Sequence, residues 1–172
     1  MTDASAESLG TAAGGAALTP PGGLAPDLRE ILAQEVVLKG EALAWAGSPR
    51  NLDDAALSRF GDLTGWECFD TSFHLEDNVP VRVHIREDGA PEISEDDQRT
   101  LLLHGIACAM EFRHVLRRAN HLGPVRCIIG ANETNATFRF HRIRPGESWT
   151  DPDLDRYRTD KIVVVDIKPA AS

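Results

Sequence analysis

Cysteine is scarce in this sequence, and no two cysteines are close together. The chain of 172 residues has three, Cys68, Cys108 and Cys127. A small secreted protein held together by disulfides is expected to carry more cysteines, in even number. A zinc ribbon or a thioredoxin-type redox site needs a C-x-x-C pair, which the sequence lacks. These classes are therefore excluded, and the three cysteines are predicted to be buried, reduced thiols.

Basic charge is also in short supply. Lysine and arginine together number 18, against 27 aspartates and glutamates, which gives a formal net charge of -9. A nucleic-acid-binding protein needs a basic surface that releases counterions, so this balance argues against a nucleic-acid partner. No apolar run is long enough to span a membrane. A secretory signal requires a basic segment near its start, and no basic residue precedes Arg29. We therefore expect a cytoplasmic protein without a membrane segment.

The first 26 residues differ in composition from the rest. Ala, Gly and Pro fill 15 of these 26 positions. Such a segment buries too little apolar surface to offset its ordering entropy, so residues 1–26 are predicted to be a disordered arm. Residues 27–172 are long enough to form one domain with its own core.

Three helices are predicted. The first begins at Pro26, has apolar residues at helical spacing from Leu28 to Val36, and ends at the break of residues 47–49, although Gly40 allows a hairpin over residues 36–45 instead. A short helix over residues 51–61 is capped by Asn51 and ends at Gly61. The longest begins at Ser94, where Asp97 completes a capping box, and runs to an arginine-rich end before Gly123.

Alternating apolar and polar residues predict the strands. Residues 66–75 and 81–86 alternate and flank a turn, as do strands near residues 125–129 and 138–144. The run 162–167 is apolar on both faces, which suits a central or well-covered strand. The expected fold class is α+β: a two-layer domain with a mainly antiparallel sheet of about five strands packed on one long helix, preceded by N-terminal helices.

A pattern of arginine and histidine occurs twice on these strands. One copy is Arg82, His84 and Arg86, and the other includes Arg139 and His141. Side chains alternate across a strand, so each set shares one face, and both sets would gather if their hairpins lie in one sheet. Such a face could bind a phosphate, a carboxylate or an acidic partner, because the arginine fork pairs with these anions. The alternative is a solvated face neutralised by Glu67, Asp70 and Glu76.

Trp149 is the other candidate binding residue. It lies in an irregular loop over residues 145–160. A tryptophan in a loop is either an anchor in the core or a contact residue at an interface, where tryptophan is enriched. The sequence alone leaves both readings open.

Motifs for metal or enzyme chemistry are missing. His104 and Cys108 share a helix face, but no second close pair completes a zinc site, so no metal is predicted. The sequence has no nucleophile elbow, and no glycine-rich phosphate loop follows a predicted strand. No cofactor is therefore expected, and these observations argue against an enzyme. If the protein is an enzyme, His84 and His141 are the candidates for proton transfer.

These features favour a small acidic interaction protein. We expect an inhibitor, immunity protein or antitoxin, or an adaptor, that acts by binding another protein; electrostatic steering would favour a basic partner. The alternative is a small enzyme or sensor that binds an anionic ligand with Arg82, His84, Arg86, Arg139 and His141.

Overall fold

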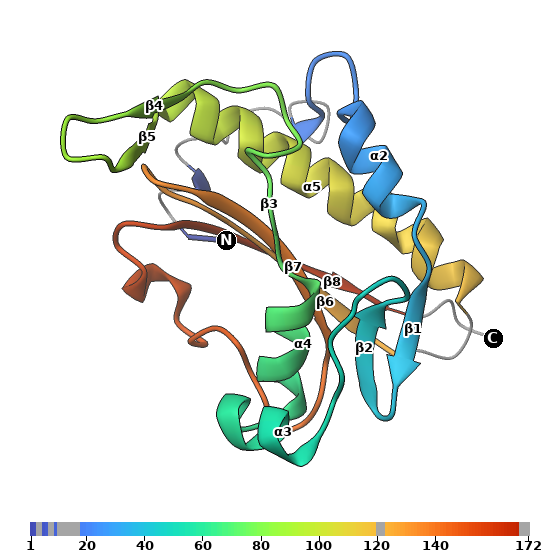
Figure 1. Cartoon of the computed structure of the whole chain (residues 1–172). Helices are drawn as coiled ribbons and strands as arrows, with labels where there is room; N and C mark the ends of the chain where they lie inside the picture. Colours follow the sequence, from blue (N-terminus) through green and yellow to red (C-terminus); the bar gives the residue numbers. More distant parts are fainter. Residues whose placement is uncertain (3–4, 7–8, 10–17, 120–122, 169–172) are drawn as a thin grey trace.

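The computed structural model describes residues 1–2, 5–6, 9, 18–119 and 123–168. These residues form a mixed α+β structure with several antiparallel sheets (Figure 1). The helices are α2 (Pro26–Leu32), α3 (Asp54–Phe60), α4 (Leu63–Thr71), α5 (Glu95–Arg118) and the 3-10 turn η2 (Leu154–Arg156). The strands are β1 (Val36–Lys39), β2 (Ala42–Trp45), β3 (Phe73–His74), β4 (Val83–Ile85), β5 (Pro91–Ile93), β6 (Val125–Ala131), β7 (Ala136–Arg142) and β8 (Lys161–Ile167).

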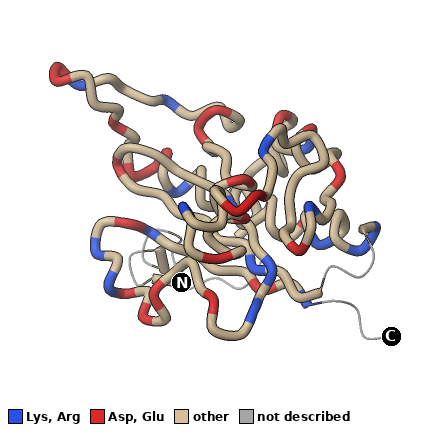
Figure 2. Tube along the Cα trace, turned by 60° about the horizontal axis from the view of Figure 1, so that its bottom comes forward, with Lys and Arg blue, Asp and Glu red and all other residues tan. Residues whose placement is uncertain are grey.

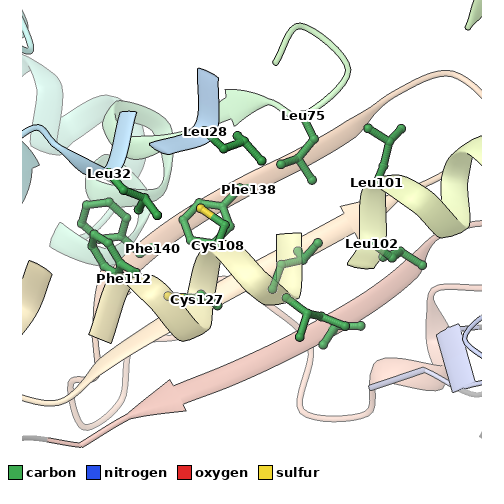
Figure 3. Packing of buried hydrophobic residues seen from close by; sticks show 14 of the residues in the cluster. Leu28, Leu32, Leu75, Leu101, Leu102, Cys108, Phe112, Cys127, Phe138 and Phe140 are labelled. Atoms are coloured by element: carbon green, nitrogen blue, oxygen red, sulfur yellow. The ribbon is translucent and has the colours of Figure 1, made fainter. Parts of the chain in front are cut away.

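The central sheet has the strand order β3-β7-β6-β8 and packs one face against α5. Figure 3 shows Phe138 and Phe140 of the sheet beside Phe112 of the helix, and the rings of Phe112 and Phe140 lie 4.5 Å apart between centroids. Helix and sheet approach closely at Gly105, where an added Cβ would lie 2.5 Å from Cγ2 of Ile129. Burial of these apolar side chains supplies the main stabilisation of the fold.

The opposite face of the central sheet carries a second layer. Helix α4 packs on β7. The hairpin β1–β2 contacts both layers, because its alanines pack on α4 whereas Trp45 contacts Phe112 of α5. The Thr71 hydroxyl donates to the Phe140 carbonyl at 2.8 Å and accepts from the Phe140 amide at 3.0 Å, which fastens the end of α4 to the strand. Trp66 fills the space between α4 and the alanines of β2.

The first predicted helix is too long. It ends at Leu32, and residues 36–45 form the hairpin that Gly40 allowed. Lys39 pairs with Ala42, so the loop has two residues, and Gly40 adopts a φ of +61° that side chains disfavour. Strand pairing and packing on α4 outweigh the helical spacing of the apolar residues.

The predicted strand over residues 66–75 is wrong for most of its length. Residues 63–71 form α4, which begins where the Asp62 carboxylate accepts from the Gly65 amide at 2.6 Å. The helix is buried on nearly every side, so it lacks the one-sided pattern of a surface helix. The apolar and polar residues of this segment alternate by chance, and this alternation is also the pattern of a strand.

The predicted pairing of residues 66–75 with 81–86 is also wrong. Strand β4 pairs with β5 instead, in the register Val83 to Ile93. The strands accordingly form sheets of two, four and two strands rather than one sheet of about five. Strand β8 lies at an edge of the central sheet, not in its middle.

Three local predictions are confirmed. Ser94 caps α5, and its hydroxyl accepts from the Asp97 amide at 3.2 Å. The β6–β7 hairpin pairs around residues 131–136. The short helix α3 forms and ends at Gly61, although Asp53 rather than Asn51 is its cap.

The predicted disordered arm, residues 1–26, includes residues 3–4, 7–8 and 10–17, which lie outside the described residues. Among the others, the Thr2 amide donates to the Ile162 carbonyl at 2.9 Å. Leu9 and Leu24 are buried in the main core cluster. Within the described ranges, no helix is both long enough and apolar enough to cross a membrane.

Candidate functional site

The first candidate site is the outer face of the central sheet, the face opposite α5. Directly paired residues of neighbouring strands point to the same side, so the ladder defines which residues share this face. Arg126 on β6 pairs with His141 on β7 and with Asp166 on β8. The next row pairs Ile128 with Arg139 and Val164. The buried cluster of Cys68, Ile128 and Ile162 shows that α4 covers part of this face, together with Leu154 and Tyr157 of the 143–160 loop.

Arg139 is a half-buried cation on the outer face. Its Nη2 donates to the Thr137 hydroxyl at 3.0 Å, and its Cζ lies 5.2 Å from the centroid of the Trp149 ring. Burial lowers the pKa of Arg139, while the nearby Cys68 raises it. Burial raises the pKa of Cys68 far above its usual range, so this thiol is neutral. Among the described residues, Arg139 forms no ion pair with a carboxylate.

The two neighbouring arginines differ from Arg139 because each has a carboxylate partner. Arg126 donates to both oxygens of Asp166, at 2.7 and 2.8 Å, and these bonds hold the pKa of Asp166 below its usual range. Arg144 donates to both oxygens of the fully buried Glu67, at 2.9 and 2.6 Å. The charges of these four residues are therefore balanced within the protein.

His141 lies two residues from Arg139 on the same face and is 1% exposed. Its Nδ1 is 2.7 Å from the Arg142 carbonyl, which can only accept, so Nδ1 carries the proton. Nε2 then holds a lone pair, and this buried atom has no hydrogen-bond partner in the part of the chain that the structure describes. Burial lowers the pKa of His141, which keeps the ring neutral.

Trp149 lies at the surface and is 42% exposed. The loop that carries it is held by Glu147, whose carboxylate accepts from the Thr64 amide at the start of α4 at 3.0 Å. Thr150, the next residue, is buried, and its carbonyl accepts from the Ser148 hydroxyl at 2.7 Å. Of the two readings of Trp149, core anchor and surface contact, its exposure favours the second.

The two arginine and histidine sets lie in different sheets, so the condition under which they would gather is not met. Arg82, His84 and Arg86 lie on or beside β4, in a two-stranded sheet apart from the central sheet that holds Arg139 and His141. His84 is exposed and His141 is buried, so the two histidines have different surroundings. The alternation of apolar and polar residues shows which residues of a strand share a face, but it does not show which strand lies beside it.

The hairpin β4–β5 and the first turn of α5 form a second candidate site, which we call the hairpin end. The hairpin is joined to the β6–β7 turn by the Ile93 amide, which donates to the Glu133 carbonyl at 2.7 Å, and by Arg86, 3.7 Å from the Glu133 carboxylate. Figure 2 shows the hairpin standing out from the molecule with acidic residues at its tip. The exposed acidic residues of the hairpin end are Glu87, Asp88, Glu92, Glu95, Asp96 and Glu133.

His104 and Cys108 on α5 are the residues considered as metal ligands, and no metal site is expected there. Nδ1 of His104 accepts from the Ala25 amide at 3.3 Å, which ties α5 to the residue that precedes α2. No group of three or more possible ligands that could hold a metal ion occurs in the described ranges. All three cysteines are buried free thiols, as predicted.

Sequence reasoning missed the pairing of Glu67 with Arg144. It named Glu67 only as a possible neutralising charge and placed it on a strand. The two residues are 77 positions apart, and no local motif joins them. Glu147, which caps α4 and lies 4.0 Å from Arg144, was missed for the same reason.

A family model, that of the Uncharacterized protein PM0498 family, matches residues 19–172. No curated protein and no solved structure matches the chain.

Proposed function

The chain belongs to the Uncharacterized protein PM0498 family, and we propose that it is a small acidic interaction protein that binds a basic protein partner through the hairpin end. The observation that carries this proposal is the exposure of Ile85, which is 69% exposed on the projecting hairpin. A protein that acts by such binding would be an inhibitor, immunity protein or antitoxin, or an adaptor.

The apolar face of the hairpin begins in the core and continues into solvent. Val83 and Ile85 share one side of β4, and they pair across the hairpin with Ile93 and Pro91. Ile93 is buried in the main core and Val83 packs against it, so this end of the hairpin is anchored. The Ile85–Pro91 pair lies outside that core. An isoleucine presented in this way is an apolar anchor that a partner could bury.

The charges around Ile85 indicate the chemistry of the partner. Six exposed carboxylates lie in the hairpin and its surroundings; Glu133 pairs with Arg86 and Glu95 pairs with Lys161, which leaves the negative charge in excess. An apolar centre with a charged rim is the usual anatomy of a protein interface. A negative rim accelerates encounter with a positively charged surface. A basic protein is therefore the complementary partner.

A cytoplasmic location is part of this proposal. It is supported by the three buried free thiols, which are typical of proteins in a reducing compartment.

The test is purification of the tagged full chain from its own host, followed by binding measurements with the recovered partner. The proposal requires a stoichiometric, net-basic protein whose affinity falls at least tenfold for Ile85→Asp. Its association rate should also fall as the salt concentration rises. Leu38→Asp is the matched control, because Leu38 is 45% exposed on β1, away from the hairpin end. Equal binding by the wild type and Ile85→Asp would disprove the proposal.

A further inference from the structure

The surroundings of Arg139 indicate a binding site other than the hairpin end. A half-buried guanidinium normally has a carboxylate partner, because an unpaired charge away from water is costly. Arg126 and Arg144, towards the C-terminal end of β7, both obey this rule. Arg139 contacts the Thr137 hydroxyl and the Trp149 ring, and both of these groups are neutral. The site therefore has one positive charge that no described residue balances.

Among the described residues, two buried polar atoms on the elements that flank Arg139 also lack hydrogen-bond partners. One is Nε2 of His141, which is on the same side of β7; side chains two residues apart on a strand are about 7 Å apart. The other is the hydroxyl oxygen of Thr64, which is 1% exposed. Thr64 lies one turn before Cys68 on α4, and Cys68 is the thiol whose pKa the Arg139 charge lowers. An uncompensated cation and unpartnered polar atoms thus occur on facing elements.

We propose that the outer face binds a small oxyanion that carries an O–H group, held between Arg139 and His141 beneath Trp149. Arg139 donates to the anionic oxygens, as its planar fork does to phosphates and carboxylates. His141 Nε2 accepts from the O–H group, because its tautomer leaves a lone pair there. Hydrogen phosphate and 2-hydroxycarboxylates both have this combination of groups. Acetate has the charge without the hydroxyl.

Trp149 reports on this site. It is 42% exposed, whereas Trp45 and Trp66 are 7% and 1% exposed. An anion that draws on the Arg139 charge weakens the cation–π contact, so the emission of the exposed tryptophan should change on binding. The Trp149→Phe variant keeps an aromatic ring and removes the signal.

The test compares inorganic phosphate, lactate and acetate with sodium chloride at equal ionic strength and pH 7.5. Phosphate or lactate should raise the melting temperature by several degrees and change the Trp149 emission, because a ligand stabilises the state that binds it. Acetate should have a smaller effect. A response to phosphate alone identifies the phosphoryl class, and a response to lactate alone identifies the hydroxy acids.

Variants separate binding from folding. Arg139→Met should abolish the anion effect while leaving the melting temperature in chloride unchanged or higher, since it removes an unbalanced charge. His141→Gln is the second variant, and it should weaken the anion effect at least fivefold. Arg82→Ala is the control and should respond like the wild type, because Arg82 lies beside β4.

Three results would overturn the proposal: no effect of phosphate or lactate beyond chloride, an effect that persists in Arg139→Met, or an effect that is lost in Arg82→Ala. If Arg139→Met does not fold, an unchanged response of His141→Gln to phosphate and lactate would overturn the proposal. This test is independent of the partner-binding function, because none of its variants alters Ile85 or the acidic residues around it.

Discussion

Glu67 and Arg144 form a buried ion pair that joins four parts of the chain. Nη2 of Arg144 lies 2.6 Å from Oε1 of Glu67, and the carboxylate also accepts the amides of Leu43 and Arg142. The pair therefore connects α4, the β1–β2 hairpin, the end of β7 and the start of the loop that carries Trp149. This arrangement positions the outer face of the sheet.

Glu67→Ala should be among the most destabilising substitutions in this protein. It leaves the Arg144 charge and two backbone amides without their acceptor, and breaking a buried pair from one side costs about 3–5 kcal/mol. Urea unfolding monitored by circular dichroism measures the loss. Asp166→Ala is the matched control, because the Asp166 side chain is 39% exposed and such pairs contribute about 1 kcal/mol or less. Equal losses in the two variants would contradict this account.

Acid should destabilise the protein through two buried histidines. Burial lowers the pKa of His104 and of His141 from the model-compound value of 6.5, so the folded state keeps both neutral while the unfolded state protonates them. Their contribution to stability is complete above pH 6.5 and is lost as the pH falls below it. The urea midpoint measured from pH 8 to pH 5 tests this prediction.

Histidine variants test whether His104 and His141 cause the loss of stability in acid. His104→Gln and His141→Gln should each flatten the decline of the urea midpoint between pH 6.5 and pH 5. His114→Gln, at an exposed position on α5, should leave it unchanged. The lowered pKa of Asp166 acts in a separate window, because its contribution is lost only as the pH falls below about 4. A decline that persists without both buried histidines would contradict the prediction.

Gly105→Ala should destabilise the fold even though alanine favours helices more than glycine does. The new Cβ would lie 2.5 Å from Cγ2 of Ile129 and 3.2 Å from Cδ1 of Leu75, so the helix must move away from the sheet. Overpacking of this kind costs about 1–3 kcal/mol. The Ile129→Ala background removes the clash, and the cost of Gly105→Ala should shrink there in a double-mutant cycle. Additive effects would argue against the close approach.

The cysteines should be unreactive until the protein unfolds. Cys68, Cys108 and Cys127 are all buried, and burial raises the pKa of Cys108 to about 12, so the reactive thiolate is rare at pH 8. A disulfide reagent such as Ellman's reagent should therefore label the native protein slowly and all three thiols in urea. Rapid labelling of one thiol in the native state would identify an exposed cysteine and contradict the burial.

Local signals in the sequence were sufficient for some of these elements. The cap at Ser94 and the acidic first turn determine where α5 begins, because a side chain satisfies the free amides within one turn. The hairpin of β6 and β7 is likewise determined by two alternating runs that flank a polar turn. The end of the short helix α3 at Gly61 also follows from a local signal, although its cap is Asp53 and not the predicted Asn51.

The candidate sites depended on more distant contacts. Arg139, His141 and Trp149 could be named from their residue types, but the contact between Arg139 and Trp149 joins a strand to a loop. The expected union of these residues with Arg82, His84 and Arg86 failed, because β4 pairs with β5 and not with the central sheet. Alternation shows which face a residue occupies, and it carries no information about which strand lies beside it.

The sequence by itself determined the α+β class, the long helix, its capped start and the hairpin of residues 125–142, because these depend on interactions between near neighbours. Only the tertiary structure decided that residues 63–71 are a buried helix, that the described strands form three sheets, and that Glu67 pairs with Arg144 whereas no described carboxylate pairs with Arg139. The reason is physical: burial on several sides hides the periodicity of a helix, and an ion pair between distant residues forms only after the elements have packed.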